Sequence, residues 1–475
     1  MGLYLGIQIF SAVHGSQSKL ENRLHFRFAK VAQPVKNRGI SMYNIGEEEI
    51  NAIAGVIRSG KLFRYGEGEQ CLTFEKRYAD YLGSKHFRLT CSGSYALHAA
   101  IVGLGIGPGD EVIVPAHTYM ATATSVLTAG AIPVVIDVDE SITMDPDALE
   151  DAVGPQTKAV IPVHIWGASC NMDAIMSVAT KHNLLVIEDT CQGIGGGYEG
   201  RMLGTIGHAG AYSFNYFKNI GAGEGGGVVI NDDALDKRIA CVIDPCHYYW
   251  TGRTEDFMPF ASNGARASEI MGAILNSQLD RLPEMIAAMR TEKNQILANT
   301  RHLDNLGLKP TPMNSPNYEC GTHVMYTMPT AEVAAKFSEV MPSVIAGKTG
   351  RHTYTEWDQI LIGEGAAHPL MNPYKMDANQ KCRRTVTKDM LPRSLDILGR
   401  TVMIPTDPCH SEEQISKMIR NIEVAARYAF GEMTSSEIES RMAEFKDADK
   451  IDSRKYDTDV AAYGLGQQVE TTATL

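Results

Sequence analysis

Several features that mark common classes of protein are missing from this sequence of 475 residues. It has no run of about 18 uninterrupted apolar residues, which excludes an ordinary membrane-spanning helix. Its nine cysteines form no Cys-x-x-Cys and no Cys-x-Cys pair, so the usual zinc-ligand and dithiol spacings are excluded. The sequence also has no internal repeat and no low-complexity tract, which leaves an ordinary globular protein.

The sequence also has fewer basic than acidic residues. Lys and Arg number 44 against 56 for Asp and Glu, which gives a formal net charge of −12. A chain of this charge repels a phosphate backbone, so we expect no nucleic acid partner and no membrane contact. An anionic ligand must instead be held locally, for example by N–H groups at a helix N-terminus. The odd number of cysteines favours reduced thiols and therefore a cytoplasmic protein.

The length suits one large and one smaller domain, with different segments at the two ends. Residues 1–40 combine an apolar start with a basic stretch and are predicted to be a disordered leader. Residues 41–310 are predicted to form the large domain and residues 311–430 a smaller α+β domain. The polar stretch 431–475 is predicted to be a disordered tail.

Short apolar runs alternate with helical stretches through much of the large domain. The predicted strands are residues 111–115, 132–138, 158–164, 184–189, 210–214 and 226–231. Amphipathic windows such as 94–104 and 172–183 lie between them. This order predicts an α/β protein with a mostly parallel sheet covered on both faces, whose ligands bind beyond the carboxyl ends of the strands.

Helical periodicity dominates after the large domain's strands. From about residue 265, apolar residues recur three and four apart, which predicts long helices that lead out of the large domain. In the smaller domain, HVMYTMP (323–329) is a predicted strand. Ser411 and Gln414 have the spacing of a capping box and predict the start of a closing helix.

Two charged side chains stand out near the ends of predicted strands. Asp189 ends the run LLVIED, where a buried carboxylate needs a partner unless it serves as a helix N-cap. Lys218 lies in SFNYFKNIGAGEGGG, between aromatic residues and a glycine-rich turn. An isolated lysine is usually a surface charge. Aromatic neighbours and a glycine-rich turn are instead typical of a pocket wall, where an amine can lose its proton and act as a nucleophile.

A pyridoxal phosphate site needs four parts: an acid for the ring nitrogen, an amine, small residues for the phosphate and an aromatic ring for stacking. The first two are available in Asp189 and Lys218. CSGSYALHAAI supplies Gly93 and Ser94 at the start of a predicted helix, and Tyr119 follows the strand 111–115. Taken singly, each of these last features is equally typical of a helix cap or a packed aromatic residue.

From residue 43 to 430 the chain resembles the DegT/DnrJ/EryC1/StrS family of pyridoxal phosphate-dependent sugar aminotransferases, in the aspartate aminotransferase superfamily (fold type I). The resemblance rests on ordered motifs: CSGSYAL, GIGPGDEVIVPAHTYMATA, GAIPVVIDVD, KAVIPVHIWG, VIEDTCQGIGG, GRMLGTIGHAGAYSFNYFKNIGAGEGG and RASEIMGAILNSQL. It implies a mostly parallel seven-stranded sheet in the large domain, pyridoxal 5′-phosphate as cofactor, and a homodimer with shared active sites.

The resemblance also implies roles for individual residues. Lys218 would form a Schiff base with the cofactor, and Asp189 would hold the pyridine nitrogen protonated. The other implied cofactor-binding residues are Gln192 near the phenolic oxygen, Tyr119 stacked on the ring, and Gly93, Ser94 and Ser213 at the phosphate.

One family contact is altered in this sequence. The asparagine that family members contribute from the neighbouring subunit falls at Gly264, so we expect the adjacent Asn263 to replace it. The resemblance places His164 at the active-site face, where it is a candidate substrate contact. The other candidate substrate-binding residues form a polar and aromatic set suited to a sugar or an anionic group: Arg351, His352, Tyr354, Trp357 and His368.

The implied reaction is a ping-pong transamination in amino-sugar biosynthesis. Glutamate or glutamine would give its nitrogen to the cofactor, and a keto sugar, most often nucleotide-linked in this family, would collect it. VIEDTCQGIGGGYEGRMLGTIG is also similar to family members that act on a free sugar acid such as an 8-oxo-octulosonate, so that alternative stays open.

Other functions are disfavoured by particular residues. The string GAGEGG (221–226) matches the dinucleotide-binding pattern GxGxxG, but it precedes a predicted strand instead of following one. Sugar dehydratases of the family replace the lysine with histidine, and Lys218 argues against that branch. A non-catalytic binding protein would be expected to lose Lys218, Asp189 or Gln192. Cys241, Cys246 and His247 lack a further ligand at zinc spacing.

Overall fold

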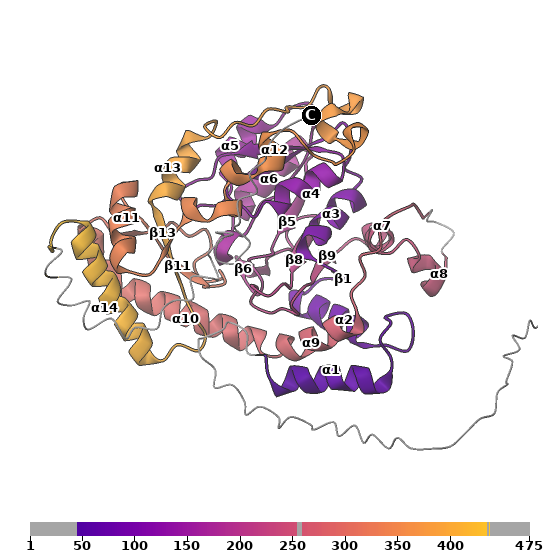
Figure 1. Cartoon of the computed structure of the whole chain (residues 1–475), viewed down its shortest axis with the longest axis horizontal. Helices are drawn as coiled ribbons and strands as arrows, with labels where there is room; N and C mark the ends of the chain where they lie inside the picture. The colour runs from indigo at the N-terminus through magenta and orange to yellow at the C-terminus, as the bar shows by residue number, and fades with distance from the viewer. Residues whose placement is uncertain (1–44, 254–258, 435–436, 438–475) are drawn as a thin grey trace, which may run out of the picture. The chain divides into compact units, whose positions relative to one another are not determined.

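A seven-stranded sheet forms the centre of the computed structural model, which describes residues 45–253, 259–434 and 437 (Figure 1). In spatial order its strands are β1 (His86–Thr90), β9 (Gly226–Ile230), β8 (Ala209–Ser213), β5 (Leu185–Asp189), β4 (Thr157–Val160), β2 (Glu111–Pro115) and β3 (Ile132–Ile136). Within this sheet β9 runs antiparallel to both of its neighbours, and the other pairs are parallel. The predicted mostly parallel, seven-stranded α/β sheet is confirmed.

Side chains on the central strands alternate between two cores. On β2, Val112 and Val114 pack into one core, and Ile113 between them packs into the other. The helices in the first core are α3 (Gly93–Gly103), α4 (Ala121–Thr128) and α7 (Asp233–Ile243), and those in the second are α5 (Pro146–Ala152) and α6 (Met172–His182). Because both faces are covered, the strands are apolar throughout, which is why they could be predicted as continuous runs.

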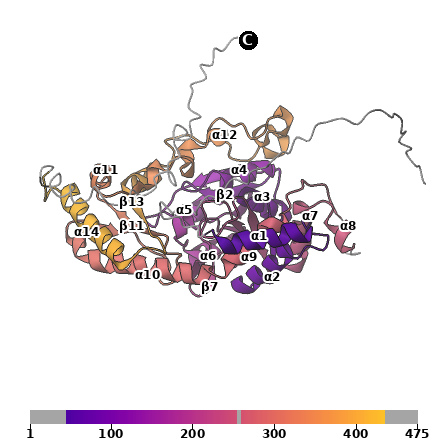
Figure 2. The same ribbon diagram turned by 60° about the horizontal axis from the view of Figure 1, so that its bottom comes forward.

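A layer of helices extends from the start of the described chain to the smaller domain. It contains α1 (Glu47–Ser59), α2 (Gln70–Leu82), α9 (Glu269–Leu279) and α10 (Leu282–Thr300). Both α1 and α2 pack against α9, and α10 then continues from the large sheet to the smaller domain (Figures 1 and 2). These helices confirm the prediction made for the sequence after residue 265. Two smaller elements, α8 (His247–Thr251) and the hairpin of β6 (Gly197–Tyr198) and β7 (Arg201–Met202), complete the large domain.

The smaller domain has its own antiparallel sheet and core. The strand order is β10 (Lys309–Pro310), β11 (His323–Thr327), β13 (Thr401–Pro405) and β12 (Val344–Ile345), and its helices are α11 (Ala331–Val340), α13 (Pro392–Arg400) and α14 (Glu412–Ala429). The capping box at α14 is confirmed. The Ser411 hydroxyl accepts from the Gln414 N–H, and the Gln414 side chain accepts from the Ser411 N–H.

Part of the range predicted for the smaller domain packs into a core of the large sheet. Tyr354, Trp357, Tyr374 and Cys382 lie inside the range assigned to the smaller domain, yet they are buried in the core shared by α3 and α4. The short helix α12 (Asp358–Leu361) accordingly lies against α4 (Figure 2). The chain therefore returns to the large sheet before it forms α13, and burial of these apolar side chains favours that path.

The predicted leader 1–40 and most of the predicted tail 431–475 lie outside the described residues. Among the described helices, none is both long enough and apolar enough to cross a bilayer.

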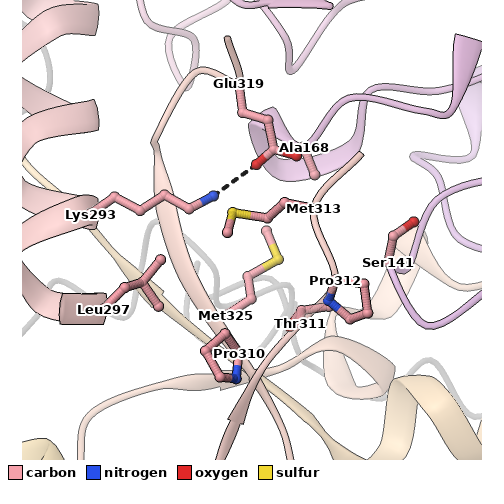
Figure 3. A pocket seen from close by; sticks show the side chains of 10 residues that line it. All are labelled: Ser141, Ala168, Lys293, Leu297, Pro310, Thr311, Pro312, Met313, Glu319 and Met325. Carbon is pink, nitrogen blue, oxygen red and sulfur yellow. Dashed lines mark hydrogen bonds and ion pairs between the residues drawn. The ribbon is translucent and has the colours of Figure 1, made fainter. Parts of the chain in front are cut away.

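A small cavity lies where α10 and the loops beside β10 and β11 meet the large domain (Figure 3). In its wall, Lys293 Nζ donates to Glu319 Oε2 at 2.8 Å. Both side chains are almost completely buried, at 10% and 3% exposure. The second oxygen of Glu319, Oε1, has no hydrogen-bond partner among the described residues, so this carboxylate depends on Lys293 for its charge compensation.

We therefore expect Lys293→Met to lower the free energy of unfolding by about 3 kcal/mol, because it leaves a buried carboxylate unpaired. Urea denaturation followed by circular dichroism measures this loss. The double variant Lys293→Met/Glu319→Leu should recover most of it, since it removes the unpaired charge as well.

The matched control is Lys85→Met, which breaks the exposed ion pair between Lys85 and Asp233. Its unfolding midpoint should stay at the wild-type value. A Lys293→Met protein as stable as this control would contradict the assignment.

Candidate active site

Asp189 is the last residue of β5 and is 4% exposed. Its Oδ1 accepts a hydrogen bond from the Cys191 N–H at 3.1 Å, and its Oδ2 accepts one from the Thr122 hydroxyl at 2.7 Å. Two donors from different elements therefore fix the orientation of this carboxylate at the carboxyl edge of the sheet.

Lys218 lies in the connection between β8 and β9, at the same edge of the sheet. Burial lowers the pKa of its amine, although the nearby Cys191 and Asp189 act in the opposite direction. These electrostatic interactions mean that Lys218 and Asp189, predicted to work together, do lie near each other. A lowered pKa increases the fraction of neutral amine at pH 7, which is the nucleophilic form. Burial raises the pKa of Cys191 well above its usual value, so that side chain is a neutral thiol.

The start of α3 forms a narrow cradle beside these residues. A Cβ atom on Gly93 would lie 2.6 Å from Ser213 Cβ and 3.1 Å from Cys191 Sγ, so glycine is needed for this approach. Gly226, the first residue of β9, similarly leaves room for the backbone of Ser92. The start of the helix is thus packed closely against Ser213 at the end of β8. Such a site fits the phosphate of pyridoxal phosphate, because helix N-termini favour anions.

Aromatic rings form another wall of the site. The Tyr119 ring lies 5.5 Å from the His352 ring, and His352 in turn lies 4.6 Å from Trp166, measured between centroids. The guanidinium carbon of Arg351 lies 5.6 Å above the Tyr119 ring, within the range of a cation–π interaction. Arg351 is exposed, so it also remains accessible to an anionic substrate.

His352 is neutral at physiological pH. Burial is the main reason that its pKa falls to about 4, and the positive charges of Lys218 and Arg351 lower it further. Its Nδ1 is 3.1 Å from the Thr349 carbonyl oxygen. A carbonyl can only accept, so Nδ1 carries the proton and Nε2 is left as an acceptor.

Trp166 is a site residue that sequence reasoning missed. Its φ of 52° is in the left-handed region, which costs a non-glycine residue energy. Its N–H donates to Gln192 Oε1 at 2.9 Å, its carbonyl accepts from the Thr322 hydroxyl at 2.5 Å, and its indole N–H donates to His117 at 2.9 Å. Trp166 thus connects the Gln192 loop to the smaller domain. The signal in the sequence was its position directly after the polar end of a predicted strand.

Several predicted site residues are placed elsewhere. His164 is fully buried, and its ring binds Glu188 and the Cys170 N–H. Tyr354 is also fully buried, and its hydroxyl donates to the Lys388 carbonyl at 2.7 Å. In both residues the polar groups of a buried side chain are thus satisfied within the protein. His368 is exposed and caps a short turn by accepting from the Leu370 N–H.

Two further predicted cofactor-binding residues, Asn263 and Ser94, are exposed. Asn263 is exposed, and its carbonyl accepts from the Tyr95 hydroxyl. Ser94 is exposed at the start of α3. Residues 221–226 lead into β9 and do not open a helix, so they are not a dinucleotide-binding turn. Within the described ranges no group of three His, Cys, Asp or Glu side chains could hold a metal ion.

Comparison with known proteins agrees with this geometry. The model of the DegT/DnrJ/EryC1/StrS aminotransferase family matches residues 43–423. The GDP-perosamine synthase of Caulobacter vibrioides is 42% identical over 226 residues, which cover 46% of this chain and 59% of that protein. The spore coat polysaccharide biosynthesis protein SpsC of Bacillus subtilis is 44% identical over 196 residues, or 41% of this chain and 50% of that protein. The matched stretches thus span little more than half of these relatives.

A solved structure extends the similarity over most of the fold. The aminotransferase from Psychrobacter cryohalolentis superposes with a TM-score of 0.68 at 25% sequence identity, and the match covers 82% of this chain and 100% of that one.

The lowered pKa of His352 predicts a change in stability with pH. Its folded value of about 4 lies below its value of about 6.5 in an unfolded chain. As the pH falls from about 6.5 to about 4, the unfolded chain takes up a proton that the native protein does not, so the native state loses stability. We expect His352→Gln to remove this loss. Urea denaturation of both proteins should show the variant gaining on the wild type below about pH 6.5 and no further change below about pH 4. A difference between the two proteins that is independent of pH would contradict the assignment.

Proposed function

The chain belongs to the DegT/DnrJ/EryC1/StrS aminotransferase family, and on that premise we propose that it is a pyridoxal phosphate-dependent aminotransferase that moves an amino group from an amino acid to a keto sugar. The observation that carries this proposal is the pairing of Lys218, an amine whose pKa is lowered, with Asp189 at the end of β5. Pyridoxal phosphate supplies an electron sink that allows a carbon bearing an amine to lose a proton.

Each residue around the site has a different proposed role. Lys218 Nζ binds the aldehyde carbon of the cofactor, and Asp189 pairs with the ring nitrogen and keeps it protonated. The other contacts proposed are Tyr119 against the ring face, Gln192 near the phenolic oxygen, and Gly93, Ser94 and Ser213 at the phosphate. The narrow approach of Gly93 to Ser213 supports the last of these, because it leaves N–H groups and hydroxyls to face an anion.

Lys218 also acts on the proton. Once the amino group of the donor has displaced it from the cofactor, a neutral Nζ would take the proton that the amine-bearing carbon loses and give it to the former aldehyde carbon of the cofactor. Its lowered pKa favours this role, because an acid–base group is most effective when its pKa lies near the working pH. The buried surroundings of Asp189 limit the access of water to its carboxylate, which strengthens its interaction with a charged partner.

The proposed acceptor is a nucleotide-linked keto sugar, and the proposed donor is glutamate or glutamine. The names of the two curated relatives, a GDP-perosamine synthase and a spore coat polysaccharide protein, support amino-sugar biosynthesis. The exposed Arg351 beside Tyr119 suits the diphosphate of such a substrate. The same guanidinium would suit the carboxylate of a free keto sugar acid, which keeps that alternative in the test below.

We further propose a homodimer in which each site receives Asn263 from the partner subunit. The exposure of this side chain, close to the start of α9, leaves it available to a second copy. We also propose a cytoplasmic location, which the free thiols of the described cysteines support because they suit a reducing compartment.

The half-reaction with the donor tests the proposed function directly. Glutamate or glutamine should convert the cofactor bound to the wild type into its amine form, seen as a change in visible absorption. A keto sugar should then restore the original spectrum, and a panel of nucleotide-linked sugars and free sugar acids identifies the acceptor. Lys218→Ala should keep the wild-type thermal stability and lose at least about 1,000-fold in turnover, since both the attachment and the proton transfer use this amine. Full activity in this variant would overturn the proposal.

Mixing two inactive variants tests the shared site. Lys218→Ala and Asn263→Ala should each be impaired as homodimers. In an equal mixture, half of the dimers combine the two variants, and one of the two sites in each of these is intact. The mixture should therefore regain about a quarter of the wild-type activity. Activity equal to the average of the two separate variants would show that Asn263 acts within its own subunit or not at all.

A further inference from the structure

Two buried threonines connect α4 to Asp189. The Thr122 hydroxyl lies 2.7 Å from Asp189 Oδ2, and the Thr118 hydroxyl lies 2.6 Å from that of Thr122. Thr118 is 1% exposed and Thr122 is 0% exposed, so water does not compete for these hydrogen bonds. Three polar groups thus form one continuous chain that ends at the carboxylate.

The direction of the hydrogen bonds follows from the chemistry of the groups. An ionised carboxylate only accepts, so the single hydrogen of Thr122 points to Asp189. The Thr122 oxygen then accepts from Thr118, whose alternative acceptor, the Tyr119 carbonyl, is 3.4 Å away. Aligned donors of this kind reinforce one another, and a hydrogen bond to a charged acceptor is stronger than one between neutral groups.

The buried hydroxyl of Thr122 has a different kind of acceptor from those of Thr300 and Thr401. The hydroxyls of Thr300 and Thr401 donate to the carbonyls four residues earlier, Ile296 and Ile397, which is the usual way to satisfy a buried threonine in or after a helix. The Thr122 hydroxyl instead reaches a side chain 67 residues away, on another element. Packing of α4 alone does not require this contact.

The local backbone places this contact next to the ring-binding residue. The Thr122 N–H, in the first turn of α4, donates to the carbonyl of Tyr119, which lies just before that turn, at 3.0 Å. One short segment therefore carries the aromatic side chain for the cofactor ring and the hydroxyl for the acid beneath it.

We propose that Thr122 is a positioning residue for Asp189: its hydroxyl, supported by Thr118, holds the carboxylate in the orientation that keeps the cofactor's ring nitrogen protonated. This inference rests on the proposed function, because it concerns pyridoxal phosphate bound at Asp189. It adds two residues that act through Asp189 and do not touch the substrate.

The protonation of the ring nitrogen provides the test. Wild type, Thr122→Val and Thr122→Ser are loaded with pyridoxal phosphate labelled at the ring nitrogen, and the nitrogen resonance is recorded by NMR at neutral pH. In Thr122→Val, which keeps the shape of the side chain without the donor, the resonance should move towards that of unprotonated pyridine. The dissociation constant of the cofactor should rise about tenfold. Thr122→Ser should restore the wild-type resonance.

Thr401→Val is the matched control, since it removes one buried hydroxyl from the smaller domain. It should leave both the resonance and the cofactor affinity unchanged. A purely structural role for Thr122 would make the two valine variants alike.

The order of the chain gives a second test. Thr118→Val should shift the resonance in the same direction but less, because it acts only through Thr122. The double variant Thr118→Val/Thr122→Val should be no worse than Thr122→Val alone. The proposal fails if Thr122→Val keeps the wild-type resonance, if Thr122→Ser shifts it as far as Thr122→Val does, or if the two single effects add. Failure of the wild type to bind pyridoxal phosphate would instead overturn the proposed function, and this inference with it.

Discussion

A carboxylate at the end of a fully buried strand must be given hydrogen-bond donors, and this requirement organises the site. The pleat of β5 directs its last two residues, Glu188 and Asp189, to opposite faces of the sheet. Glu188 is satisfied by the N–H groups of Gly204, Ile206 and Gly207 together with the His164 ring, and it serves only to hold a loop. Asp189 is held by fewer donors and keeps capacity for a ligand. Of these two neighbouring acids, Glu188 therefore has a structural role and Asp189 is available to bind a ligand.

The other parts of the site reach Asp189 from separate elements of the same edge. Lys218 comes from the β8–β9 connection, the cradle at Gly93 from the start of α3, and Tyr119 from the start of α4. A parallel sheet brings these segments together because its strands all end on one side. Trp166 links the smaller domain to this edge of the sheet, because its carbonyl accepts a hydrogen bond from Thr322. This bond and those to Gln192 and His117 hold its left-handed backbone in place. The position of the smaller domain is thereby linked to the side chain of Gln192.

The features predicted from the sequence are those with a local signal. Strand 111–115 was predicted to the residue because both of its faces are buried and it reads as one apolar run. Strand β1 (His86–Thr90) was missed because it lies at the edge of the sheet, where Arg88 pairs with Asp236 and interrupts the apolar pattern. Tyr354 looked like a substrate residue because its sequence neighbours are polar, and nothing local reveals that it packs against α3 and α4. Contacts between distant segments, such as that of Thr122 with Asp189, cannot be predicted from the spacing of residues along the chain.

The return of residues near Trp357 and Cys382 to the large sheet also governs when this protein can fold during its synthesis. The core around α3 and α4 is not complete until these side chains leave the ribosome, long after the last strand of the large sheet has emerged. In that interval the nascent chain exposes apolar surface that has no intramolecular partner, a state that is prone to aggregation and is the usual client of chaperones. A truncated chain that ends after α10 would remain in that condition permanently.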